Sequence, residues 1–286
     1  MTTTVTVTGT GTPIPTPDRA GPGVLVVHGP TGGKPVCIQV DAGRGTVMRL
    51  LGAGTDPGEL DLVLLTHHHS DHLVGLDDLV LTRWVMDRGR QLAPLKVVAP
   101  DGPCVRFAKG LVDRWSEDLT VRASHAGRDR DLEVEVIPFD YPVSPTEVWR
   151  SGEVRVSAGQ VRHEPVHPAV GYRIETPDGV VVVSGTRWCA TRWPLSPLVP
   201  TFWLRGDAFS EIRPLPEHRR FIIDYHADTV EIGRQARDLA VPTLCYPPDP
   251  TPASDADEQA FIDDVRSGGY GGEVVVARDL RRSPLG

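Results

Sequence analysis

A seven-residue stretch from Thr66 to His72 reads Thr-His-His-His-Ser-Asp-His. Imidazole and carboxylate groups bind zinc and also iron or manganese, so this stretch is rich in metal-binding side chains. In extended backbone His67 and His69 project to the same side, because they are two residues apart. Asp71 follows at the turn into a helix and can face a second metal position next to the first. This spacing favours a metal site over a solvated, histidine-rich loop.

The elements that flank this stretch are a strand and a helix. Residues 61–65 form a short apolar run that predicts a buried strand, and apolar residues recur at helical spacing from Leu73 to Trp84, with Gly89 as a C-terminal cap. Elsewhere the pattern predicts strands at 2–8, 24–27, 36–40, 154–156, 171–175, 180–184 and 273–277, and helices from Asp228 to before Pro242 and at 257–266.

Two strand-rich halves, each followed by helices, indicate two sheets packed face to face with helices outside. No low-complexity linker separates the halves, so we expect one domain over residues 1–286. The last ten residues are expected to fray. Isolated histidines such as His28, His125 and His218 are expected at the surface rather than at a metal.

The charge and composition exclude several classes of protein. The 286 residues are 40% hydrophobic and 24% charged, with a formal net charge of −8. This charge disfavours binding to nucleic-acid backbones or anionic membrane surfaces. No apolar run approaches the roughly 20 residues of a membrane helix, and no signal peptide is recognisable. The four cysteines are scattered, which fits a reducing compartment, so we expect a cytoplasmic protein.

Further motifs surround the histidine stretch. They are Gly-Thr-Gly-Thr-Pro at 9–13, Val-Asp-Ala-Gly-Arg-Gly-Thr at 40–46, Gly-Leu-Asp-Asp-Leu at 75–79, His-Glu-Pro at 163–165 and Gly-Tyr-Arg at 171–173. With them the chain, from about Val5 to Pro250, resembles the metallo-β-lactamase fold family, in the branch of ribonuclease Z and the arylsulfatase- and phosphodiesterase-like hydrolases. The resemblance implies a four-layer αββα sandwich of two mixed sheets, in which Asp41 braces the metal loop.

The resemblance also implies the ligands. His67, His69 and His163 would hold a first metal, and Asp71 and His72 would belong to a second, with Asp71 also orienting the attacking water. Zinc is the expected metal, with iron or manganese as alternatives. Zinc held by three histidines with an open position lowers the pKa of bound water to about 7.

Two ligands of the family are missing. A bridging aspartate is expected after the long valine strand, but the chain reads Ser-Gly-Thr-Arg there, so the aspartate is either deleted or replaced by Thr186. A final histidine is expected near Leu244, and residues 245–249 contain none. We therefore expect one metal per chain rather than two, with an empty site as the alternative.

A pair of residues that delivers a proton to the leaving group survives in altered form. The resemblance assigns it to Asp207, where the family has glutamate, and to His226. His226 stands just before a predicted helix N-terminus, where the helix dipole favours neutral imidazole. The alternative interpretation is an ordinary polar contact at the start of that helix.

Three functions follow from these observations. The first is a metal-dependent hydrolase of a small-molecule ester, phosphodiester, sulfate ester or lactone. The second is a repurposed scaffold, either a biosynthetic enzyme with non-hydrolytic or Lewis-acid chemistry or a metal-poor pseudoenzyme. The third, tRNA 3′-end cleavage, ranks last because the chain is acidic and lacks a basic Gly/Pro-rich arm. We expect a small-molecule substrate and neither a nucleic-acid nor a membrane partner. A homodimer is possible.

Overall fold

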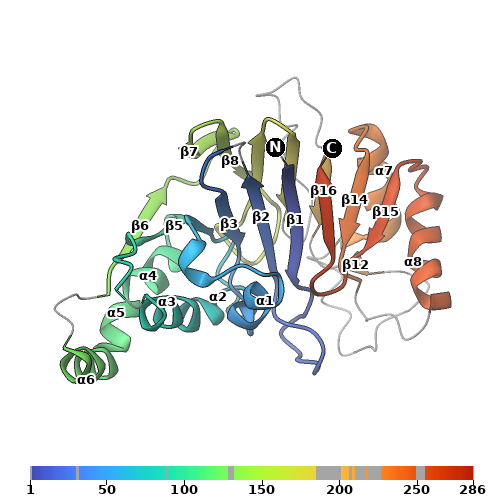
Figure 1. The fold of residues 1–286 in the computed structure, drawn as a ribbon. Helices are drawn as coiled ribbons and strands as arrows, with labels where there is room; N and C mark the ends of the chain where they lie inside the picture. The colour runs from blue at the N-terminus through green and yellow to red at the C-terminus, as the bar shows by residue number, and fades with distance from the viewer. Residues whose placement is uncertain are drawn as a thin grey trace.

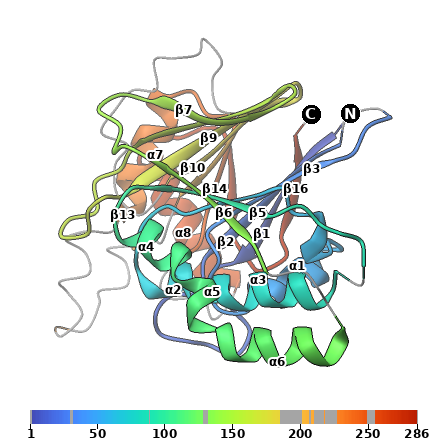
Figure 2. The ribbon, with the colours of Figure 1, turned by 90° about the vertical axis from the view of Figure 1, so that its left-hand side faces the viewer.

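The computed structural model describes residues 2–29, 32–87, 89–127, 132–184, 201–205, 208–209, 217, 227–248 and 255–285. Within these residues, two seven-stranded sheets pack face to face, and helices cover the outer face of each (Figures 1 and 2). This arrangement confirms the predicted four-layer αββα sandwich.

The first sheet has the strand order β16-β1-β2-β3-β4-β5-β6. Its strands are β1 (Thr2–Gly9), β2 (Gly23–Gly29), β3 (Val36–Val40), β4 (Leu62–Leu64), β5 (Leu95–Pro100), β6 (Val134–Phe139) and β16 (Arg282–Leu285). The pairs from β16 to β3 are antiparallel and those from β3 to β6 are parallel, so the sheet is mixed.

The second sheet has the order β15-β14-β11-β10-β9-β8-β7. Its strands are β7 (Thr146–Ser151), β8 (Val154–Gln160), β9 (Val170–Thr176), β10 (Gly179–Ser184), β11 (Phe202–Arg205), β14 (Thr243–Tyr246) and β15 (Glu273–Val276). It is also mixed, since β7 to β10 pair antiparallel and β10 to β15 pair parallel. A separate short pair joins β12 (Ala208–Phe209) to β13 (Ala227–Asp228).

Helices lie outside both sheets. Beside the first sheet are α1 (Thr46–Gly52), η1 (Pro57–Glu59), α2 (Ser70–Leu73), α3 (Gly75–Val85), α4 (Pro103–Lys109), α5 (Leu111–Arg114) and α6 (Ser116–Ala126). Beside the second are α7 (Thr229–Asp238) and α8 (Asp255–Ser267), which pack on each other. As predicted, α7 starts at Asp228, whose carboxylate accepts a hydrogen bond from the Glu231 amide.

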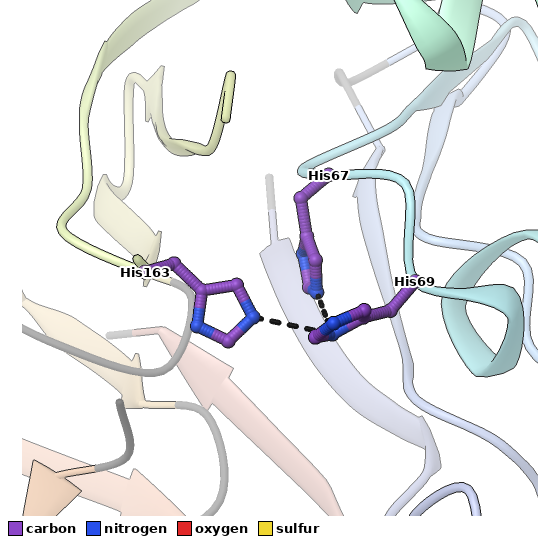
Figure 3. Close-up of side chains that lie close together, drawn as sticks. All are labelled: His67, His69 and His163. Carbon is purple, nitrogen blue, oxygen red and sulfur yellow. Dashed lines mark hydrogen bonds between the residues drawn. The ribbon is translucent and has the colours of Figure 1, made fainter. Parts of the chain in front are cut away.

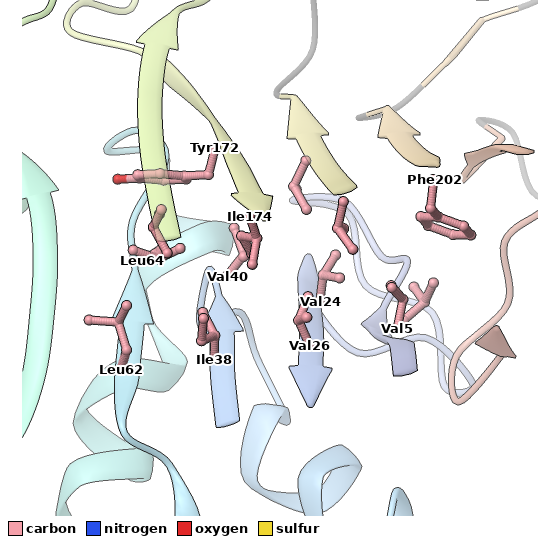
Figure 4. Close-up of a cluster of buried hydrophobic side chains, with 14 of the residues drawn as sticks. Val5, Val24, Val26, Ile38, Val40, Leu62, Leu64, Tyr172, Ile174 and Phe202 are labelled. Atoms are coloured by element: carbon pink, nitrogen blue, oxygen red, sulfur yellow. The ribbon is translucent and has the colours of Figure 1, made fainter. Parts of the chain in front are cut away.

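The alternation of side chains along each strand builds the layers. In β4, Leu62 and Leu64 face the second sheet, while Val63 faces the helices of the first. Figure 4 shows the resulting core between the sheets, where Leu64 lies beside Tyr172 of β9. Burial of this apolar surface, at about 25 cal/mol per Å², is the main force holding the sheets together.

Three sequence-based predictions are wrong. Gly89 does not cap the helix that ends at Val85, because Met86 is its C-terminal cap. The C-terminal residues do not fray: β16 pairs with β1 in the register Thr3 with Leu285, so β1 is covered by a further strand. His28 is also not a surface residue, since it is 3% exposed and its Nδ1 lies 2.9 Å from the Thr3 hydroxyl. It lies 3.3 Å from a carboxylate oxygen of Asp178, so a polar cluster buries it between the sheets.

Among the residues described, none of the helices combines the length and the apolar character needed to cross a bilayer.

Candidate metal centre

The histidine stretch leaves the end of β4 in irregular backbone and enters α2 at Ser70. Two backbone carbonyls at its start are tied to β9 of the other sheet. The Tyr172 hydroxyl donates to the Leu65 carbonyl at 2.7 Å, and the Val170 amide donates to the Thr66 carbonyl at 3.0 Å. These two bonds fix where the first sheet presents its histidines to the second.

Asp41 organises the stretch from the end of β3. One carboxylate oxygen accepts the Thr66 amide at 2.8 Å, and the other accepts the Thr66 hydroxyl at 2.8 Å and lies 2.7 Å from Nδ1 of His72. Asp41 has a φ of 54°, a left-handed conformation that aspartate tolerates better than most residues. The bracing role that the resemblance implied for Asp41 is thus visible as contacts.

Close backbone contact brings the loop after β3 against α2. The Ala42 amide donates to the His72 carbonyl, and the Gly75 amide donates to the Ala42 carbonyl, both at 2.8 Å. A Cβ on Gly75 would overlap the carbonyl oxygen of Gly43. Glycine is therefore required at the start of α3 to let Asp41 reach the histidine loop.

Three imidazoles converge at this place (Figure 3). Nδ1 of His69 lies 3.0 Å from Nε2 of His67 and 3.2 Å from Nε2 of His163. His163 comes from the loop between β8 and β9, so the group joins both sheets. His67 and His163 are buried, and His69 is half-buried. Among the described residues, these three form the group whose ligand atoms all lie within 4.8 Å of one another.

Two of the three imidazoles, those of His67 and His69, are held in their neutral form. Burial, and then the neighbouring His72, His163 and other histidines, lower the pKa of His67 well below its usual value. Burial also lowers the pKa of His69, although the charge of Asp71 opposes the shift. Both rings are therefore uncharged at neutral pH, and an uncharged imidazole has a nitrogen lone pair for a cation.

The donor set fits a zinc ion. Zinc bound by histidine has Zn–N distances of about 2.0–2.1 Å, which places tetrahedral nitrogens about 3.3 Å apart. The separations of 3.0 and 3.2 Å from His69 Nδ1 are close to that spacing. Imidazole nitrogens bind iron as well as zinc, so the three side chains fit a divalent transition-metal ion.

The two residues predicted for a second metal lie beside this group but outside it. Asp71 is 3% exposed, and its Oδ1 atom has no hydrogen-bond partner within the described part of the chain. The Asp71 Oδ2 atom lies 3.8 Å from Nε2 of His72, whose ring centroid is 4.1 Å from that of His67. A buried carboxylate oxygen is therefore available next to the three imidazoles.

Three further residues of the predicted site lie outside the described residues: His226, Asp207 and Thr186. Near the missing final histidine, Tyr246 is fully buried and packs in the core beneath α7 and α8. Sequence reasoning missed the hydroxyls of Thr66 and Tyr172; for Thr66 its place between a strand and the first histidine was a signal that could have been used.

Comparisons with known proteins identify the family of the chain. Residues 37–186 match the metallo-beta-lactamase superfamily. A protein named ribonuclease Z, from Mycobacterium bovis (strain BCG / Pasteur 1173P2), is 33% identical over 276 residues, covering 93% of this chain and 92% of that protein. This superfamily match and the relative named ribonuclease Z bear out the prediction of a metallo-hydrolase.

Solved structures share the fold at low sequence identity. The metallo-beta-lactamase fold protein YhfI from Bacillus subtilis has a TM-score of 0.71 at 18% identity, covering 99% of this chain and 100% of that one. A diphosphatase from the PhnP family has a TM-score of 0.64 at 18% identity, covering 99% and 97%. Fold, histidine geometry and the ribonuclease Z relative lead to one conclusion: the chain belongs to the metallo-β-lactamase superfamily.

Proposed function

We propose that the protein is a metal-dependent hydrolase that cleaves a small-molecule ester, phosphodiester, sulfate ester or lactone. His67, His69 and His163 would hold one metal ion per chain, with zinc expected and iron or manganese as alternatives. The observation that carries this proposal is the convergence of three imidazoles from both sheets. Zinc held by three histidines supplies a water nucleophile at neutral pH, because it lowers the pKa of water to about 7.

Asp71 would act on the attacking water. Its buried Oδ1 atom, which has no partner within the described residues, can accept a hydrogen from that water and so orient it. The neighbouring His72 is held by Asp41 through Nδ1. Asp71 and His72 are therefore the residues to which a second cation would bind if one were present.

The proton for the leaving group would come from His226, with Asp207 as its partner. This assignment rests on the family resemblance of residues 206–209 and 225–228. His226→Ala is expected to lower kcat while leaving the metal content unchanged, since the residue would move a proton rather than hold the metal. Loss of metal in this variant would contradict the assignment.

Cleavage of tRNA 3′ ends is the second candidate. The observation in its favour is the 33% identity to a protein named ribonuclease Z over nearly its whole length. The net charge of −8 argues against it, because binding to a phosphate backbone depends on lysine and arginine. The repurposed or metal-poor scaffold remains the alternative if no metal binds.

The first experiment is elemental analysis of protein purified without an affinity tag, beside His163→Ala. We expect about one equivalent of zinc in the parent, because the three histidines form one group. The variant is expected to lose it. Hydrolysis is then measured on bis(p-nitrophenyl) phosphate, p-nitrophenyl acetate and a tRNA precursor with a 3′ trailer.

Turnover of the small esters that is lost in His163→Ala would support the proposal of a metal-dependent hydrolase of small molecules. Cleavage restricted to the tRNA precursor would replace it by the second candidate. Two metal equivalents would mean that other residues supply the missing ligands. A metal-free parent protein would contradict the proposal and favour the repurposed or metal-poor scaffold.

A further inference from the structure

We propose that Thr66 is a positioning residue that fixes the tautomer of His67. In that tautomer the hydrogen sits on Nδ1 and the lone pair on Nε2, the atom that faces His69 and His163. The inference rests on the metal site proposed above. It assigns to Thr66 a role in metal affinity that is separate from its place in the backbone.

The direction of each hydrogen bond follows from the donors available. The carboxylate of Asp41 is acceptor-only, and the Thr66 Oγ1 atom lies 2.8 Å from its Oδ2 atom. The single hydroxyl hydrogen of Thr66 must therefore point to Asp41. Toward His67, whose Nδ1 lies 2.9 Å away, the same hydroxyl oxygen can only accept.

The tautomer of His67 follows from that accepting oxygen. Nδ1 of His67 must carry the hydrogen, because it is the donor to Thr66. A neutral imidazole has one N–H group, so Nε2 is left with a lone pair. Nε2 is the atom 3.0 Å from Nδ1 of His69 (Figure 3). The hydrogen-bond partner of the other ring nitrogen commonly sets the tautomer of a metal-binding histidine in this way.

Burial makes this chain of bonds hard to replace by water. Thr66 and His67 are each 1% exposed, and Asp41 is 5% exposed. The Thr66 amide also donates to Asp41, so the threonine is held at two points. Asp41 contacts His72 directly but reaches His67 only through the Thr66 hydroxyl. The hydroxyl thus extends one buried carboxylate to a second imidazole.

Removal of the hydroxyl removes this control. In Thr66→Val the side chain keeps its shape, but Nδ1 of His67 loses its acceptor. The ring can then place its hydrogen on Nε2 and donate it to His69 Nδ1, 3.0 Å away. That arrangement occupies the lone pairs that a metal would need. We expect zinc affinity to fall about 10- to 100-fold, the usual effect of removing a group that hydrogen-bonds to a metal-binding histidine.

The test compares Thr66→Val with Thr66→Ser, which restores the hydroxyl. Zinc affinity is measured by competition with a chromogenic chelator. The tautomer is measured from the imidazole 15N chemical shifts of His67 in metal-free protein at pH 8, assigned with His67→Gln. We expect the Nδ1–H form in the parent and in Thr66→Ser, with zinc affinity within about threefold of the parent.

Two results would overturn the inference. An Nε2–H tautomer in the parent refutes it whether or not Thr66→Val folds. Unchanged zinc affinity in a folded Thr66→Val protein refutes it as well. Because the tautomer is read in metal-free protein, it does not depend on which ester the protein hydrolyses. Absence of all hydrolysis would refute the proposed function and leave this inference standing.

Discussion

The hydroxyl of Tyr172 is one of the two contacts through which β9 holds the start of the histidine loop. It donates to the Leu65 carbonyl at 2.7 Å, and both residues are 0% exposed. Burial, followed by the charge of Asp41, raises the pKa of Tyr172 well above its usual value, so the hydroxyl stays protonated. Tyr172→Phe removes this single atom and leaves the ring in the core.

The expected cost comes mainly from the carbonyl that is left behind. A buried polar group without its partner costs about 1–3 kcal/mol, whereas loss of one oxygen opens too little space for a large cavity penalty. For 286 residues the entropy of unfolding is about 600 cal/mol/K, from about 2.1 cal/mol/K per residue. The unfolding midpoint of metal-free protein should therefore fall by about 2–5 °C.

Tyr246→Phe is the matched control, because Tyr246 is equally buried but its hydroxyl has no partner within the described residues. This second substitution should leave stability unchanged or raise it. Both variants are compared with the parent by urea unfolding followed by fluorescence. A Tyr172→Phe protein within about 0.5 kcal/mol of the parent, or one no less stable than Tyr246→Phe, would refute the reasoning.

Two further predictions concern titration. Burial raises the pKa of the Cys37 thiol to about 11 and those of Cys104 and Cys245 to about 12. Folded Cys189→Ser protein should thus react with Ellman's reagent at pH 8 only as it unfolds, and rapid labelling would contradict this burial. Because the pKa of His67 is lowered in the folded protein, the unfolded chain binds a proton at this residue at a higher pH than the folded protein does. Metal-free protein should therefore lose stability as the pH falls below about 6.5, by up to about 1.4 kcal/mol per pH unit. Urea unfolding at pH 7.5 and 5.5 measures the loss, and an unchanged slope in His67→Gln would refute its assignment to His67.

The elements that the sequence predicts well are those with a strong local signal. Apolar runs mark β3, β10 and β15 within a few residues, and Asp228 marks the start of α7. The spacing of His67 and His69 is also a local signal, and the two rings do meet. His163 is 94 residues from His69, so only the family resemblance brought it to the site.

Two of the three failures share one cause, which is that a partner far away in the sequence decides the structure. The polar C-terminal segment has the sequence pattern of a frayed tail, but it forms a strand because it pairs with β1. His28 looks like a surface residue until Thr3 and Asp178 supply its polar contacts. No periodicity in either segment reveals such partners, because they are set by the packing of the two sheets.

Binding of a metal by His67, His69 and His163 would be coupled by the topology of the molecule to the packing of its two sheets. The first sheet presents His67 and His69, and the second presents His163, so neither sheet alone holds the group of three. The same two sheets meet at the carbonyls of Leu65 and Thr66, the residues just before His67. A change in the core that shifts one sheet against the other therefore shifts ligands against each other. Conversely, a metal bound by all three histidines stabilises the packed sheets by RT ln(1 + [metal]/Kd), about 2.7 kcal/mol at a hundredfold excess over Kd. Activity lost through a core substitution is thus no evidence that the substituted residue touches substrate.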